Sequence, residues 1–107
     1  MNVNNPKKKI YTIEELREKL VPVFASAPVY KAILFGSYAR GDATENSDVD
    51  IVIDSRGELR GFDFFGVMGR SEDALGKYID MYDVRELMEH SPVLEGMNHE
   101  GVVLYER

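Results

Sequence analysis

The stretch AILFGSYARGDATENSDVDIVI, residues 32–53, decides how this chain of 107 residues is expected to fold. Its first four residues, Ala32 to Phe35, form a short, continuously apolar run before Gly36, a pattern typical of a buried β-strand. Residues 48–53 begin with alternating acidic and apolar side chains and predict a second strand. Residues 36–47 are rich in Gly, Ser, Asp and Asn, so we expect a turn or loop there with at most a short helical piece.

The turn after the first strand reads Gly-Ser-Tyr-Ala-Arg-Gly, from Gly36 to Gly41. A Gly-Ser pair that leaves a buried strand lets the backbone come close to a ligand, and free N–H groups at a following helical turn attract anions such as phosphate. No Lys-Ser or Lys-Thr pair follows the glycines, so this is not a Walker A loop, which argues against kinases and GTPases.

Two carboxylates at the start of the second strand predict a metal site. Asp48 and Asp50 are two residues apart, so both side chains should point to one face, with Cα atoms roughly 6–7 Å apart. Val49, Ile51 and Ile53 take the opposite face. Two carboxylates without an adjacent Lys or Arg repel each other unless a cation lies between them, and oxygen ligands select Mg²⁺ or Mn²⁺. The alternative is a solvated strand edge beside an ordinary turn, but both halves of the motif in this order favour a nucleotide and metal site.

A third carboxylate is expected on a neighbouring strand, because two metal ions need more oxygen ligands than one pair supplies. Asp80 and Asp83 are the candidates. In a strand over residues 78–82, Ile79 and Met81 would face the core, which places Asp80 on the ligand side. Asp83 has the other parity and is better explained as the N-cap of the following helix. We therefore expect Asp80 to be the third metal ligand.

The remaining pattern alternates helices with strands. A capping box, Thr12 with Glu15, opens an amphipathic helix that should either kink near Val21 or stop and restart at Pro22. Beyond the central motif we expect a helix over 62–77, strands over 78–82 and 102–105, a helix over 83–90 and a short helix opening at Ser91-Pro92. This order indicates an α/β or α+β fold in which helices cover one face of a small sheet.

Three aromatic residues, Phe62, Phe64 and Phe65, fall within four positions at the start of the helix expected over 62–77. They cannot all face one core direction, so at least one could contact a partner. Core packing together with burial under loops is the favoured interpretation.

Composition limits the class of protein. The chain carries 13 basic and 19 acidic residues, a net charge of −6, and no cysteine, which excludes a disulfide framework, a thiolate nucleophile and a cysteine-held metal. An acidic domain is a poor ligand for long DNA. Its apolar runs are too short to span a membrane, and we expect a cytoplasmic protein with a polar arm over residues 1–9 and one domain over 10–107.

The central motif resembles the minimal nucleotidyltransferases of the DNA polymerase β-like superfamily. The similarity runs from about Ile13 to Tyr105 and rests on Gly36-Ser37, Arg40-Gly41, Asp48-x-Asp50 and Asp80 in an Ile-Asp-Met strand. The resemblance implies a nucleotidyltransferase fold with a small mixed sheet.

The resemblance also implies roles for these residues. Gly36 and Ser37 would hold the triphosphate of ATP, and Arg40 would assist. Asp48 and Asp50 would bind two Mg²⁺ ions.

Asp80 would add a metal ligand and position or deprotonate the attacking hydroxyl. Many such minimal domains are antitoxins paired with a helical HEPN toxin, and some transfer AMP onto a tyrosine of that partner, in a hetero-oligomer. Two alternatives stay open: a partner-binding antitoxin module without catalysis, and a nucleotidyltransferase that acts on a small molecule.

Overall fold

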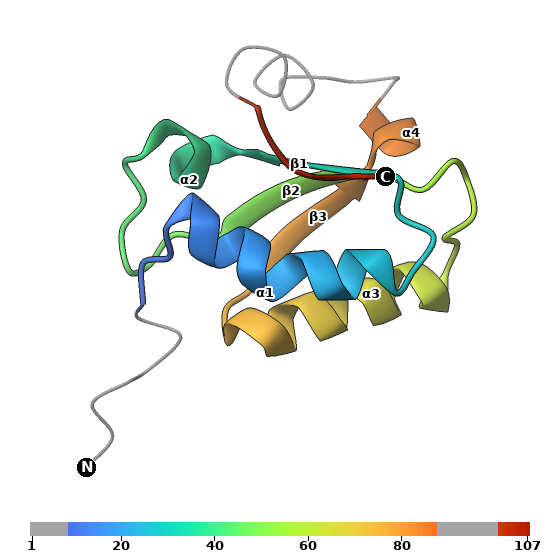
Figure 1. Cartoon of the computed structure of the whole chain (residues 1–107), viewed down its shortest axis with the longest axis horizontal. Coiled ribbons are helices and arrows are strands. Elements are labelled where there is room, and N and C mark those ends of the chain that lie inside the picture. Colours follow the sequence, from blue (N-terminus) through green and yellow to red (C-terminus); the bar gives the residue numbers. More distant parts are fainter. Residues whose placement is uncertain (1–8, 88–100) are drawn as a thin grey trace.

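The computed structural model describes residues 9–87 and 101–107. Within these ranges the strands form one mixed sheet in the order β3-β2-β1-β4 (Figure 1). Strand β1 pairs antiparallel with both β2 and β4, whereas β2 and β3 run parallel. The strands are β1 Lys31–Phe35, β2 Val49–Asp54, β3 Ile79–Asp83 and β4 Val102–Glu106, and the helices are α1 Ile13–Ala25, α2 Gly36–Arg40, α3 Phe62–Leu75 and α4 Val84–Leu87.

Two long helices cover one face of the sheet, which confirms the predicted α+β layer fold. Helices α1 and α3 lie side by side beneath the strands in Figure 1. The core between these layers includes the alternate residues Val49, Ile51 and Ile53 of β2, all fully buried. Among residues 9–87 and 101–107, no helix is long and apolar enough to cross a membrane.

The other face of the sheet carries a second, smaller apolar cluster. Phe35 at the end of β1 and Val52 of β2 pack there against Leu87 of α4. Asp50 and Asp80 share strand parity with Val52 and with Tyr82, respectively, so their side chains also belong to this face. The carboxylates therefore lie on the side of the sheet that α1 and α3 leave open.

Helix α1 starts as the sequence predicts, and of the two alternatives expected at Pro22 the stop and restart does not occur. Thr12 and Glu15 form the capping box reciprocally. The helix neither stops nor restarts at Pro22 but continues to Ala25. Pro22 and Glu18, whose carbonyl loses its helical donor, are both exposed, so water can replace the missing hydrogen bond.

The prediction that the aromatic cluster packs in the core is wrong for two of its members. Phe62 is 94% exposed and Phe65 is 59% exposed, whereas Phe64 packs against the core. All three lie in the first turns of α3, where one helical face cannot take three neighbouring rings.

Asp83 caps the helix that follows it, as expected, and is buried as well. Its Oδ1 accepts a hydrogen bond from the backbone N–H of Arg85 at 3.2 Å, and its Oδ2 accepts one from the hydroxyl of Ser55 at 2.5 Å. The residue is only 5% exposed and belongs to β3 rather than to the helix. The expected end of that helix at residue 90, the short helix at Ser91-Pro92 and most of the expected arm lie outside the described residues.

We predict that Asp83→Ala lowers the free energy of unfolding by about 1–3 kcal/mol, because it leaves the buried Ser55 hydroxyl without its acceptor. The matched variant, Asp80→Ala, alters an exposed carboxylate on the same strand and should leave stability unchanged or raise it, because it removes a negative charge beside Asp50. Urea unfolding in the presence of a chelator measures both. A larger loss for Asp80→Ala would contradict the division between a structural and a functional aspartate.

Candidate active site

The strand register brings the predicted residues to one end of the sheet. Phe35 pairs with Asp50 across β1 and β2, and Asp50 pairs with Asp80 across β2 and β3. Gly36 follows Phe35 directly, so the turn after β1 and both carboxylates meet in one row. This juxtaposition was expected from strand parity, although the sequence alone did not show which strands are neighbours.

Gly36 packs directly against the Asp50 carboxylate. A Cβ atom built at residue 36 would lie 2.3 Å from Oδ2 and 3.2 Å from Cγ of Asp50. The residue also has a φ of +73°, in the left-handed region that favours glycine. Any larger residue at this position would push the carboxylate out of its place.

The turn from Gly36 to Arg40 is the short helix α2, within the limits that the sequence predicts. Its Tyr38 is buried in the core, which anchors the helix against the sheet. Ser37 is half-buried, and its carbonyl oxygen accepts hydrogen bonds from the N–H groups of Gly41 and Asp42.

Arg40 is exposed at the end of α2. Its Nε lies 3.3 Å from Oδ2 of Asp42 in an ion pair. Its charge also lowers the pKa of Asp50, in opposition to larger effects. Arg40 is therefore close enough to the carboxylates to interact with them electrostatically.

Asp50 is the aspartate whose pKa is raised by its surroundings. Burial is the largest effect that raises its pKa, to about 6, followed by the charge of Asp80, a hydrogen bond with Asp80 and the charge of Asp48. Asp48 and Asp80 are both exposed. Because the charges of Asp80 and Asp48 both oppose the charge of Asp50, a positive charge near Asp50 would be favourable.

The donor set fits Mg²⁺ or Mn²⁺ that arrives with a nucleotide. Within residues 9–87 and 101–107, no three acidic or histidine side chains are already arranged as a metal-binding cluster. Mg²⁺ is usually held by one or two carboxylates together with substrate phosphates and water. Asp50 and Asp80 supply such a pair, and Asp48 stands beside it.

A small hollow beside Asp48 contains residues that sequence reasoning missed. It has a volume of about 200 Å³ and is lined by Glu45, Asn46, Ser47, Asp48, Lys77 and Tyr78. The sequence did not single out Lys77, because a lysine before a strand is ordinarily exposed. Only the fold shows that it is buried.

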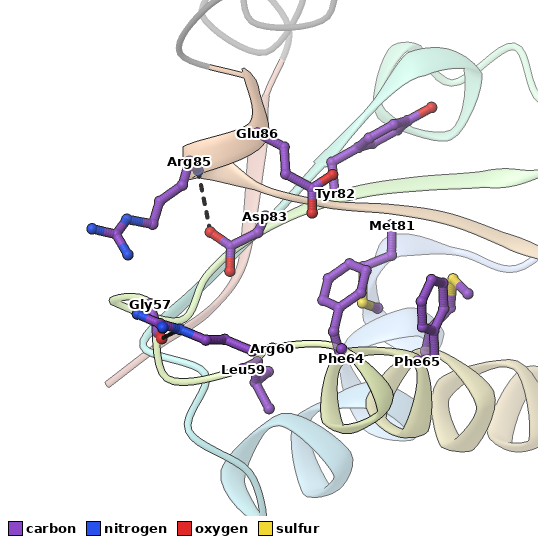
Figure 2. Close-up of a pocket in the computed structure, with 12 residues that line it drawn as sticks. Gly57, Leu59, Arg60, Phe64, Phe65, Met81, Tyr82, Asp83, Arg85 and Glu86 are labelled. Atoms are coloured by element: carbon purple, nitrogen blue, oxygen red, sulfur yellow. Dashed lines mark hydrogen bonds between the residues drawn. The ribbon is translucent and has the colours of Figure 1, made fainter.

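A larger groove, of about 470 Å³, lies near the opposite end of β3 (Figure 2). Phe64 and Phe65 of α3 line it together with Met81 and Tyr82 of β3. It contains none of the predicted site residues. Among residues 9–87 and 101–107, the acids that line it are Asp83, which serves the fold, and Glu86 on α4, so we place the candidate site at the Asp50 end.

Comparison with solved structures shows the same architecture. A candidate minimal nucleotidyltransferase superimposes with a TM-score of 0.70 at 28% identity over 86% of this chain and 95% of that one. A toxin-antitoxin crystal structure with AMP-PNP gives a TM-score of 0.70 at 24% identity, covering 85% of this chain and 73% of that chain. A complex of a tri-AMPylated Shewanella oneidensis HEPN toxin with its MNT antitoxin gives 0.66 at 20% identity, covering 90% and 74%.

Comparison of sequences identifies the family. A candidate protein adenylyltransferase of Methanocaldococcus jannaschii is 33% identical over 69 residues, which cover 64% of this chain and 74% of that protein. The family model described as "Nucleotidyltransferase domain" matches residues 10–96. With the strand register and the glycine turn in agreement, the chain belongs to the nucleotidyltransferase domain family.

Proposed function

We propose that this nucleotidyltransferase transfers AMP from ATP to a hydroxyl group of a partner protein. The observation that carries the proposal is the contact of Gly36 with Asp50, which in turn lies beside Asp80. This arrangement puts a close-approach turn for phosphates directly next to paired carboxylates. The similarity to a candidate protein adenylyltransferase supports adenylyl transfer in particular.

The turn after β1 would hold the triphosphate. Gly36 has no side chain, so the backbone of the turn lies directly against the Asp50 carboxylate, and a phosphate group held by this turn would be next to the carboxylates. The hydroxyl of Ser37 can donate a hydrogen bond to a phosphate oxygen, and Arg40 offers a positive charge at the end of α2. The nucleotide would therefore bind at the end of β1, on the face of the sheet that carries Asp50 and Asp80.

The carboxylates would hold the metal and direct the acceptor. Asp48, Asp50 and Asp80 are the proposed ligands of two Mg²⁺ ions, which when bound would neutralise charge on the attacking and leaving oxygens. Asp80 is exposed, so it can accept a hydrogen bond from an incoming hydroxyl and take its proton. The acceptor oxygen forms a bond to the α-phosphorus, and the bond to pyrophosphate breaks.

The acceptor we propose is a tyrosine of a HEPN-type toxin, with which the chain would form a hetero-oligomer as its antitoxin. Two observations support this partner. The fold is shared with a chain of the complex between a tri-AMPylated HEPN toxin and an MNT antitoxin, and with a chain of the toxin-antitoxin structure that contains AMP-PNP.

Labelled ATP tests the reaction. The protein is incubated with Mg²⁺, candidate partner proteins that include a HEPN-type toxin, and ATP that carries the label on either the α- or the γ-phosphate. We expect the α label on the toxin and release of pyrophosphate. Transfer of the γ label alone would contradict nucleotidyl transfer. Binding of ATP and toxin without transfer would favour the non-catalytic antitoxin, and α-label transfer only to a small metabolite would favour the small-molecule enzyme.

We predict that Asp48→Asn and Asp50→Asn each reduce the rate of transfer roughly a thousandfold, because a lost metal ligand removes about 4 kcal/mol of transition-state stabilisation. The control is Asp63→Asn, which alters an exposed carboxylate in the first turn of α3. Initial rates at saturating ATP measure the effect. Near-normal transfer by either site variant would refute its assignment as a metal ligand.

We predict that Asp50→Asn, although inactive, raises the melting temperature of the metal-free protein at pH 7.5. The pKa of Asp50 is about 6 in the folded state against 3.8 for an ordinary aspartate, so its contribution to stability is lost as pH rises through about 6. The neutral amide avoids that loss and can donate a hydrogen bond to Asp80.

The difference between this variant and the wild type should therefore shrink as the pH falls towards 4. Asp54→Asn is the control, since Asp54 lies at the far end of β2 and accepts a hydrogen bond from the Arg56 N–H. Thermal unfolding in a chelator across this pH range measures both. A lower melting temperature for Asp50→Asn at pH 7.5 would contradict the electrostatic description of the site.

A further inference from the structure

A buried lysine supports the loop that carries Asp48. Lys77 lies between α3 and β3 and is only 6% exposed, although lysine side chains are rarely buried. Its Nζ donates a hydrogen bond to the backbone carbonyl oxygen of Glu45, 3.1 Å away. This bond connects the α3–β3 junction to the loop between α2 and β2, 32 residues earlier in the chain.

The supported loop is a compact turn. The N–H of Ser47 donates to the carbonyl of Thr44 at 3.0 Å, and the N–H of Thr44 donates to the hydroxyl of Ser47 at 2.9 Å. Asp48 follows this turn directly. The position of the Glu45 carbonyl therefore constrains the backbone position of Asp48.

The segment that carries Lys77 is itself held in place. Gly76 ends α3 in a left-handed conformation, and its N–H donates to the carbonyl of Glu72 at 2.7 Å. The Glu72 carboxylate accepts a hydrogen bond from the N–H of Ile79 at 3.0 Å. On the other side, the carbonyl of Tyr78 accepts one from the N–H of Val49 at 3.3 Å. These hydrogen bonds hold the backbone on both sides of Lys77 in place.

Packing alone does not explain a lysine at this position. An apolar side chain of similar length could fill the same volume without the cost of removing a charge from water. Such a side chain could not donate a hydrogen bond to Glu45. The hollow that Lys77 lines contains Asp48 as well, so the lysine is next to the residue that the turn presents.

We infer that Lys77 is a positioning residue, which holds the Thr44–Ser47 turn so that Asp48 faces Asp50 and Asp80 when the metal and nucleotide bind. The inference rests on the proposed function, because it takes Asp48 as a metal ligand. It assigns to Lys77 an effect on metal affinity that is transmitted through the loop.

The direction in which cation affinity changes when Lys77 is replaced separates this role from a purely electrostatic one. Removal of a positive charge near a cation site strengthens cation binding, because it removes a Coulomb repulsion. Loss of positioning weakens it, because Asp48 no longer lies in place. A lysine that matters only for stability would lower the melting temperature and leave the metal affinity of the folded protein unchanged.

The test measures Mn²⁺ affinity by calorimetry on the full chain with α,β-methylene-ATP, an analogue that cannot be transferred. We expect Lys77→Met to weaken Mn²⁺ binding about tenfold, as is usual when a residue that orients a metal ligand is lost. Lys77→Arg keeps a donor and should restore most of the affinity. Lys19→Met, the control, removes an exposed charge from α1 and should change nothing.

Unchanged or tighter Mn²⁺ binding by folded Lys77→Met would overturn the inference. If that variant does not fold, as judged by circular dichroism, Ser47→Ala decides, because it removes the Ser47–Thr44 side-chain hydrogen bond from the same turn. Weaker binding supports the inference, and unchanged binding overturns it. Failure of the wild-type protein to bind Mn²⁺ with the analogue would instead contradict the proposed function, and the inference with it.

Discussion

Parallel pairing of β2 with β3 brings the carboxylates of Asp50 and Asp80 together, and the candidate site depends on this contact. Two like charges are held next to each other on a partly buried surface, which is unfavourable until a cation arrives. Gly36 closes the arrangement from the side of β1, because its missing side chain leaves the space that the Asp50 carboxylate occupies.

The opposite face of the sheet compensates for this local repulsion. Val49, Ile51 and Ile53 alternate with the functional side and are fully buried under α1 and α3. A continuous apolar core thus fixes the strand register, and the register in turn fixes the positions of the Asp50 and Asp80 carboxylates. Active-site residues often destabilise the folded state, and the rest of the structure compensates. Here the apolar face supplies the stability and the other face carries the repelling carboxylates.

Local patterns predicted the parts of the molecule that depend on one strand or one turn. Alternation in residues 48–53 showed which side chains share a face, and parity separated Asp80 from Asp83. The capping box of α1 was also visible in the sequence.

Features that depend on distant segments were not predictable in the same way. The burial of Lys77 follows from how the α3–β3 junction meets the loop at Glu45, and the sequence did not show which of the three phenylalanines would be exposed. Leu87 packs on the face opposite α1, which no local periodicity indicates. The contact between Gly36 and Asp50 likewise required the pairing of β1 with β2.

The most direct test of the central claim is an NMR titration of the aspartate carboxyl carbons, with and without Mg²⁺ and a non-transferable ATP analogue. Without metal, the Asp50 carboxyl should titrate at about pH 6, because burial and Asp80 oppose its charge. Addition of Mg²⁺ with the analogue should lower this pKa markedly, and Asp80→Asn should lower it in the metal-free protein. An Asp50 pKa that does not respond to metal and nucleotide would contradict the claim that this pair of carboxylates is the metal site.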